Sequence, residues 1–281
     1  MAISFRNLPK GSTIGSGSYV FRHYGDEIIP YLCFTAEEAG STIGMSVTGT
    51  PTKGQAFETS TDEITWSAFI PGTTTIPLTT IGSKVYFRGN NTTVSESSSI
   101  YYTFSMSGTI AASGNIMSLL DKTCKSTTIS NAYCFYCLFA YSNLTTAPAL
   151  PATTLASHCY DSMFADCVNL TTAPALPATT LAAYCYNSMF LDCYSLTTAP
   201  ALPATTLASH CYDSMFCYCQ SLQVYSSSGT GHTNAWRIPT SGTASSYTTQ
   251  SNMFMGCTGS YEYSDSVSLN ATFYTQNTPV S

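Results

Sequence analysis

Residues 144–169 read LTTAPALPATTLASHCYDSMFADCVN, and this 26-residue unit recurs as LTTAPALPATTLAAYCYNSMFLDCYS over residues 170–195 and LTTAPALPATTLASHCYDSMFCYCQS over residues 196–221. Only seven of the 26 positions differ between the three copies. A degenerate copy precedes them around residues 133–139, and another follows around residues 251–257. Repeated units bury their apolar faces against each other, and terminal units must be altered to face solvent. The pattern therefore predicts a stacked array with capped ends.

Each unit is predicted to contain a short extended segment, a turn and a short helix. Leu155, Cys159 and Met163 lie four residues apart, so a helix would place them on one apolar stripe. Thr154 precedes this stripe and is a suitable helix N-cap. Pro148 interrupts the preceding Thr-rich segment, which limits that segment to a short strand or polyproline-like stretch.

The units resemble those of the BspA-like leucine-rich-repeat surface proteins found in gut bacteria and their phages. The resemblance covers roughly residues 119–258, about half of the chain, and implies an α/β leucine-rich-repeat solenoid with a general surface role. It transfers no binding residue, because no binding motif is matched. The matching residues of the first unit are Leu144, Leu150, Pro151, Leu155, Met163, Phe164 and Cys167.

The part of the chain before the repeats reads as short β-strands. Seven β-rich runs between residues 31 and 106 are separated by Gly, Pro, Thr-Asp or Asn-Asn, which is typical of a small immunoglobulin-like sandwich. The expected fold class is therefore a β-rich N-terminal immunoglobulin-like sandwich followed by an α/β leucine-rich-repeat solenoid. We expect an irregular arm over residues 1–27, an anchoring or spacer sandwich over 28–110, the solenoid with its caps over 111–260, and a tail over 261–281.

Composition and charge exclude several classes of partner. Charged residues make up 9% of the chain, against roughly 25% in ordinary soluble domains. The net charge is −6, and the nine Lys and Arg residues form no basic patch, so nucleic-acid binding is not expected. No apolar run approaches the roughly 20 residues that span a bilayer. The first residues show no pattern of a signal peptide.

The cysteines recur with the repeat. Cys159, Cys185 and Cys211 are 26 residues apart, and so are Cys167, Cys193 and Cys219. The main interpretation is a set of small buried thiols that fill the core. Disulfides between neighbouring units and a zinc site are the two alternatives.

Catalytic chemistry is not indicated. His158 and Cys159 are adjacent, and adjacent helix residues point about 100° apart, so they cannot form a nucleophile–base pair on a helix. No hydrolase, metalloprotease or phosphate-binding motif is present. We therefore expect no enzymatic activity, no cofactor and no metal site.

The positions that vary between units are the candidate binding residues. Tyrosine gives large contact area at small entropic cost, so Tyr-rich surfaces with little charge suit contact with proteins or glycans. Neutral drift on a solvated face is the alternative explanation for the variation. A Ser/Gly-rich insertion after the third unit offers a second surface. The candidate binding residues are His158, Tyr184, His210, Asp166, Asp192, Tyr218, Tyr194, Gln220 and Trp236.

These observations predict a non-enzymatic structural and attachment protein. The leading hypothesis is a bacteriophage virion component, in the tail or as head decoration, that contacts a host-surface protein or glycan. The alternative is a bacterial cell-surface adhesin of the BspA-like family, and a less favoured one is an accessory part of a glycan-processing enzyme. We expect the protein on a virion or extracellular surface, beside other virion or envelope proteins, with homo-oligomerisation left open.

Overall fold

A computed structural model of the protein describes residues 29–238, 252–261 and 271–275, and its described residues from Tyr31 onward belong to one compact unit. The strands before the repeats are β1 (Leu32–Ala36), β2 (Ser41–Thr48), β3 (Phe57–Ser60), β4 (Ser67–Phe69), β5 (Thr75–Leu78), β6 (Lys84–Gly89), β7 (Tyr101–Ser107) and β8 (Ile110–Ser113). The later elements are the 3-10 helix η1 (Ile116–Leu119), β9 (Leu144–Thr146), β10 (Gln223–Tyr225), β11 (Asn234–Arg237), β12 (Thr258–Gly259) and β13 (Thr272–Thr275).

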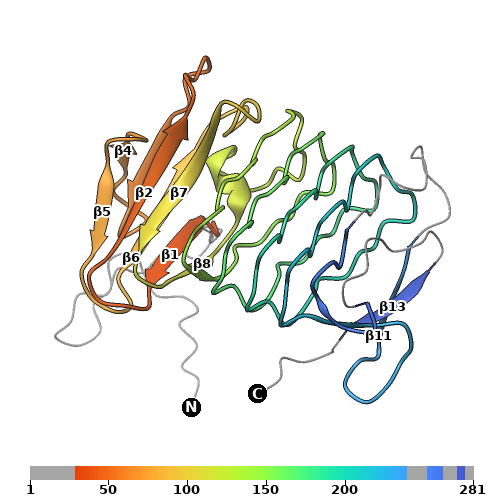
Figure 1. Ribbon diagram of the computed structural model, residues 1–281. Coiled ribbons are helices and arrows are strands. Elements are labelled where there is room, and N and C mark those ends of the chain that lie inside the picture. The colour runs from red at the N-terminus through yellow and green to blue at the C-terminus, as the bar shows by residue number, and fades with distance from the viewer. Residues whose placement is uncertain (1–28, 239–251, 262–270, 276–281) are drawn as a thin grey trace, which may run out of the picture. The chain divides into compact units, whose positions relative to one another are not determined.

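Two sheets pack face to face in the first half, here called the sheet region (residues 31–113). One has the order β4-β3-β6-β1-β8-β9, and the other has the order β5-β2-β7 (Figure 1). Alternate residues point inward, as expected for strands with one buried face. Phe34 and Phe87 from the larger sheet lie 4.8 and 5.1 Å, between ring centroids, from Phe104 of β7. These rings form the hydrophobic layer between the sheets.

The repeats form a stack of coils, here called the coil region (residues 116–222), which Figure 1 shows beside the sheets. Every second N–H group between residues 158 and 166 donates to the next coil, to carbonyls of residues 183–191, at 2.8–3.1 Å. The intervening N–H groups of residues 159–167 donate to the carbonyl three residues earlier, at 3.1–3.3 Å. The backbone donors are therefore shared evenly between turns within a coil and bonds between coils.

These turns require left-handed backbone at residues that are not glycine. His158, Ser162 and Asp166 have φ of 56°, 55° and 59°, and the equivalent residues of the other coils are also positive. Each is the third residue of a four-residue turn, the position at which a type II turn needs positive φ. A turn every four residues gives the coil its shape without a helix.

The core of the coil region consists of aligned aromatic rings. Phe139, Phe164, Phe190, Phe216 and Phe254 come from successive coils and stack in parallel, with centroids 5.3–5.7 Å apart. Phe104 of β7 continues this column, because its ring stacks on Phe139 at 5.4 Å. The hydrophobic core therefore runs without a break from the sheets into the coils.

The expected fold class is wrong. Of the described residues, 31% lie in strands or isolated β-bridges and 2% are helical; these residues contain no α-helix, so they do not form an α/β leucine-rich-repeat solenoid. Cys159 and Met163 lie in turns of period four, which mimic the 3.6-residue period of a helix, and Leu155 precedes these turns. The predicted N-cap residue, Thr154, instead forms a parallel bridge with Thr128.

The immunoglobulin-like arrangement is corrected as well. The larger sheet includes β9, which belongs to the first complete repeat and pairs in parallel with β8. β8 itself, Ile110–Ser113, crosses the expected boundary between the sandwich (28–110) and the solenoid (111–260). The sheet is thus shared between the β-rich part and the repeats. The expected domain boundaries remain predictions.

The chain after the third repeat adds a small sheet with the order β11-β13-β10-β12. β10 pairs in parallel with β12 and antiparallel with β13. Trp236 lies on β11, and its ring stacks on Phe273 of β13 at 5.5 Å. The last predicted repeat, around residues 251–257, lies partly in the described residues, where Phe216 and Tyr218 donate to Met253 and Met255.

Candidate binding surface

A ladder of four rings follows one edge of the coils. Tyr133, His158, Tyr184 and His210 stack nearly parallel, with centroids 4.3–4.4 Å apart. Each ring occupies a left-handed turn position, so its side chain leaves the coil beside the equivalent side chain of its neighbour. Three of these residues were predicted as binding residues, and the structure brings them together.

Carboxylates hold the two histidines of this ladder. Nδ1 of His158 lies 2.7 Å from Asp161, and Nδ1 of His210 lies 3.0 Å from Asp213. Asn187 replaces the aspartate in the middle coil, where tyrosine replaces histidine, and it donates to Asp161 at 3.0 Å. Histidine and aspartate therefore vary together, and the rings are half-buried.

A second line of side chains is more exposed and is here called the tyrosine–aspartate row. It consists of Tyr141, Asp166, Asp192 and Tyr218, one residue from each of four successive coils. Tyr141 is 79% exposed and Tyr218 is 41% exposed. An exposed tyrosine offers a partner both an apolar ring face and a hydroxyl group. The row therefore has the character of a contact surface.

The electrostatics of the row follow from the two adjacent carboxylates. Partial burial raises the pKa of Asp166, and the charge of Asp192 on the next coil raises it further. The hydroxyl of Tyr194 donates to Asp192 at 3.0 Å, and this bond raises the pKa of Tyr194. The charge of Asp166 raises the pKa of Tyr141. The four groups thus act on one another along the edge of the stack.

One further varied position of the repeat flanks the row. Val168, Tyr194 and Gln220 occupy one position of the repeat, and all three are exposed. Trp236 does not join these lines, because it lies half-buried on β11 in the C-terminal sheet. Of the nine predicted binding residues, eight therefore lie in three lines along the coils, two of which are joined by the bond between Tyr194 and Asp192.

Two members of these lines were missed by sequence reasoning. Tyr133 and Tyr141 belong to the degenerate first unit, where the repeat is one residue shorter before Leu144. They lie 25 residues before His158 and Asp166, respectively. The repeat, extended with this offset, would have placed both tyrosines at the start of the lines.

The cysteine ladders lie inside the coils. Cys167, Cys193, Cys219 and Cys257 are buried free thiols, and each donates to a phenylalanine carbonyl of the preceding coil at 3.0–3.1 Å. Burial raises the pKa of Cys167 to about 12. In the part of the chain that is described, no three His, Cys, Asp or Glu side chains are grouped so as to hold a metal ion.

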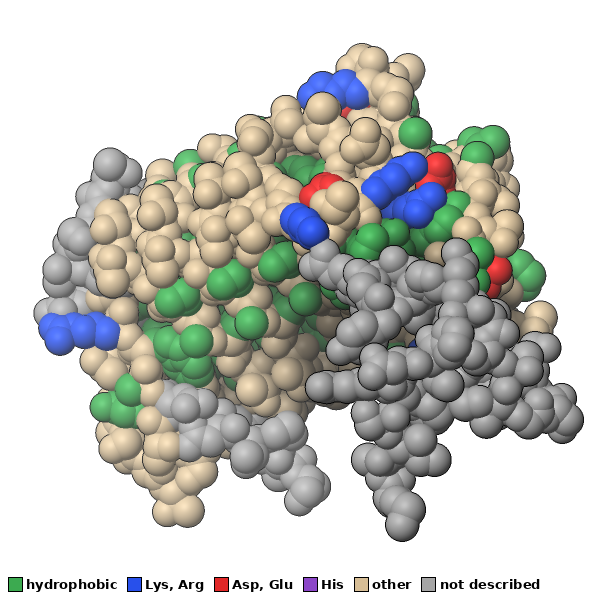
Figure 2. Space-filling view, turned by 180° about the vertical axis from the view of Figure 1, so that it is seen from behind, with side chains coloured by type: hydrophobic (Ala, Val, Ile, Leu, Met, Phe, Trp, Pro, Cys, Tyr) green, Lys and Arg blue, Asp and Glu red, His purple; other side chains and the backbone are tan. Residues whose placement is uncertain are grey.

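Charge is distributed unevenly between the two regions. The sequence has no Lys or Arg between Lys125 and Arg237. Figure 2 shows one face of the coils covered by uncharged polar and hydrophobic side chains, whereas basic and acidic side chains gather over the sheets. Residues 126–236 therefore offer hydrogen bonds and a few carboxylates, but no Lys or Arg to an anionic partner.

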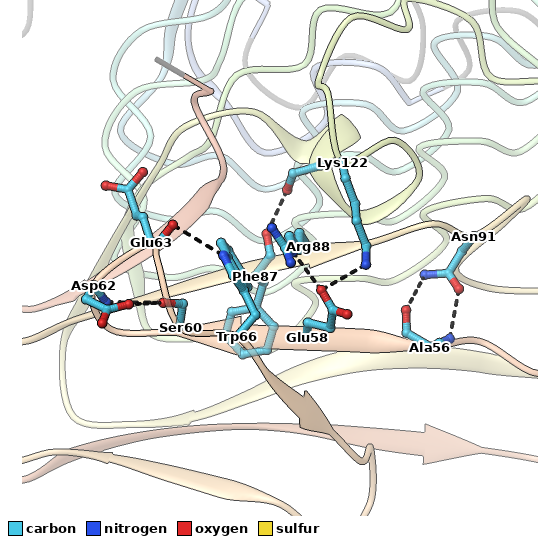
Figure 3. Close-up of polar contacts among 11 residues, drawn as sticks. Ala56, Glu58, Ser60, Asp62, Glu63, Trp66, Phe87, Arg88, Asn91 and Lys122 are labelled. Atoms are coloured by element: carbon cyan, nitrogen blue, oxygen red, sulfur yellow. Dashed lines mark hydrogen bonds and ion pairs between the residues drawn. The ribbon is translucent and has the colours of Figure 1, made fainter. Parts of the chain in front are cut away.

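The main charged cluster is structural and lies on the larger sheet (Figure 3). Glu58 of β3 accepts from Arg88 of β6 at 2.7 Å and from Lys122 at 2.9 Å. The Arg88 guanidinium carbon lies 3.8 Å from the centroid of the Trp66 ring. These contacts fasten the segment after η1 to the sheet, and the pair of cations lowers the pKa of Glu58.

Within the described residues, no helix is long and apolar enough to cross a membrane. A scan against protein-family models found no match, and searches of curated proteins and of solved structures gave none either.

Proposed function

We propose that this chain is a non-enzymatic structural and attachment protein that presents one edge of its coils as a binding surface. The observation that carries the proposal is the position of the variable residues. The units are identical at most positions, yet the differences include the exposed row and its flanking residues. Exposed residues that differ between units, held on a constant scaffold, suit recognition of a partner.

The partner is proposed to be a host-surface protein or glycan. Exposed tyrosines and paired carboxylates offer rigid apolar area together with hydrogen-bond acceptors. The core beneath them is continuous with the sheets, which are proposed to anchor the protein or to act as a spacer. A rigid support keeps such side chains in place before contact, which reduces the entropic cost of binding.

Adsorption of the purified protein to bacterial cells from the source habitat tests this proposal. We expect the double variant Asp192→Asn, Tyr194→Ser to lose at least tenfold in adsorption. Thr180→Ala changes another exposed residue of the same coil and is expected to bind like the original protein. Absence of adsorption by the original protein, or equal adsorption by the double variant, would refute the proposed surface.

The carrier is proposed to be a bacteriophage particle, with the bacterial cell envelope as second candidate, because the BspA-like repeats that these units resemble are found in both. Mass spectrometry of purified virions and of cell envelopes, searched for repeat peptides, distinguishes them. Peptides in virions support a tail or head-decoration component. Peptides in the envelope alone support a cell-surface adhesin.

A further inference from the structure

The outer face of the three-stranded sheet β5-β2-β7 is hollowed. One hollow of about 340 Å³ lies between β7 and the first coil, and another of about 350 Å³ lies over β2 and β5. Both are lined by Ser46 and Ser105, so they adjoin each other. They are here called the trough. Such concave surfaces, rather than flat ones, hold small ligands.

The alternation of the strands makes the trough rich in hydroxyl groups. Tyr102 and Phe104 of β7 point into the core, so Tyr101, Thr103 and Ser105 point outward. Across the register, Ser46 and Thr48 of β2 lie opposite Thr103 and Tyr101. None of the residues that line either hollow is charged.

Two of these hydroxyl groups donate their hydrogen to backbone carbonyls. Ser46 donates to the Thr103 carbonyl at 3.2 Å, and Thr103 donates to the Cys137 carbonyl at 3.0 Å. A hydroxyl that donates still has an acceptor lone pair. The trough therefore offers fixed acceptors to a ligand that carries several O–H donors.

Tyrosine rings form the wall nearest the coils. Tyr101 is held by an edge-to-face contact with Tyr136, at 5.3 Å between centroids. Tyr141, the first member of the tyrosine–aspartate row, is 79% exposed and lines the same hollow. An aromatic face packs against the C–H face of a sugar ring, while its hydroxyl remains in water.

Gly44 of β2 lowers the floor of the hollow over β2 and β5, next to the shared residue Ser105. A Cβ atom at this position would lie 3.0 Å from Oγ of Ser105 and 3.5 Å from Oγ1 of Thr75. Both neighbours line the trough. Any side chain here would fill the space between them.

Other ligand classes fit the trough less well. A peptide strand binds a sheet through free main-chain groups at an edge, but β2 and β7 pair with each other, and Phe104 donates its N–H to Leu138 of the first coil. An anionic ligand would meet the carboxylates of Asp166 and Asp192 beyond Tyr141, where the sequence has no Lys or Arg between Lys125 and Arg237.

We propose that the trough is a binding site for a neutral oligosaccharide, with the hydroxyls of β2 and β7 as its floor and Tyr101 and Tyr141 as its aromatic wall. This inference rests on the proposed attachment function and specifies its ligand. A saccharide seated there would extend past Tyr141 toward the row on the coils.

The test is binding to an array of neutral oligosaccharides of glucose, galactose, mannose and their N-acetyl amino sugars, with sialylated and uronic-acid oligosaccharides for comparison. Ser105→Tyr fills the junction of the hollows, and Tyr141→Asn removes the wall with a residue that tolerates the φ of 62°. Ser67→Tyr, on the exposed edge strand β4, is the matched control. Far-UV circular dichroism and urea midpoints establish that each variant folds.

We expect the original protein and Ser67→Tyr to bind at least one neutral oligosaccharide, with a loss of tenfold or more in both trough variants. Absence of binding to every neutral oligosaccharide overturns the inference. Binding confined to acidic oligosaccharides, or unchanged in the folded trough variants, overturns it too. Cell adsorption without array binding would leave the attachment function standing, whereas loss of both would refute both.

Discussion

The sheet region and the coil region satisfy their backbone groups in different ways. In the sheets, strands distant in sequence pair with each other: β1 lies between β6 and β8, and β3 between β4 and β6. In the coils, alternate N–H groups bond within a turn and to the adjacent coil, 25 residues away. The first arrangement depends on many separate segments at once, and the second depends only on neighbours. We therefore expect the two regions to respond differently to the same kind of damage.

Removal of a whole segment is expected to show the largest difference. Deletion of residues 170–195 joins two equivalent positions of the repeat, so the remaining coils keep their register and the protein folds with reduced stability. Deletion of β6 separates β1 from β3 and is expected to abolish folding. Far-UV circular dichroism and urea denaturation measure both. An unfolded protein after the first deletion would show that the coils do not behave as independent neighbours.

The second largest difference is expected at alkaline pH, which should destabilise the coils more than the sheets because most buried thiols lie in the coils. Burial raises the pKa of Cys167 and Cys211 to about 12, whereas an unfolded thiol titrates near 8.5. A group with a raised folded pKa contributes stability that is present below the unfolded pKa and is lost as pH rises towards the folded value. The urea midpoint should therefore fall steeply between about pH 8.5 and pH 11.

Two measurements check the thiol explanation. The buried thiols should resist Ellman's reagent at pH 8 in the folded protein, while all twelve cysteines react in urea. The variant Cys167→Ala should lose less stability between pH 8.5 and pH 11 than the original protein. An unchanged pH dependence in this variant would assign the effect to other groups, such as the buried tyrosines.

Removal of one aromatic ring from the core is expected to lower the stability of the protein in both regions. Phe190→Ala leaves a cavity between Phe164 and Phe216, and Phe87→Ala leaves one beside Phe34 and Phe104. Each should lower the free energy of unfolding by about 3–5 kcal/mol. Hydrogen exchange should then show loosening confined to neighbouring coils for Phe190→Ala and spread over both sheets for Phe87→Ala. Equal spreading in the two variants would remove the distinction between the regions.

The smallest expected effect concerns the left-handed turns. Ser188 has a φ of 49°, and replacement by glycine relieves the strain of a side chain in this conformation. We expect Ser188→Gly to raise the free energy of unfolding by about 1 kcal/mol. Ala183→Gly, at a residue of the same coil that is not left-handed, should lower it by roughly 0.5–1 kcal/mol. Urea denaturation at neutral pH measures both, and a destabilised Ser188→Gly would contradict the turn assignment.

Much of the organisation was visible in the sequence because it depends on repetition and alternation. The 26-residue units coincide with the stacked coils, and each β-rich run overlaps a strand. The helix prediction failed because the turns bury Cys159, Met163 and Cys167 with a period of four, close to that of a helix. Turns of this kind usually contain glycine or asparagine, whereas here the left-handed residues are His158, Ser162 and Asp166.

Tertiary contacts explain what sequence reasoning missed. The segment IAAS at β8 lacks the β-branched pattern of a strand, apart from Ile110, and pairs only because β1 and β9 lie on either side of it. The trough was equally invisible, because it combines outward side chains of β2 and β7 with Tyr141 of the first coil. The lines of varied residues could be predicted because one repeat position recurs at one place along the stack.

The bonds between coils also have a mechanical consequence. They all connect one coil to the next. Under tension along the stack, the coils would therefore detach one at a time, starting at an end. Each coil that detaches would release 26 residues, or roughly 90 Å of extended chain. A protein that links a particle to a surface would lengthen in such steps instead of breaking at once, and the number of steps would equal the number of coils.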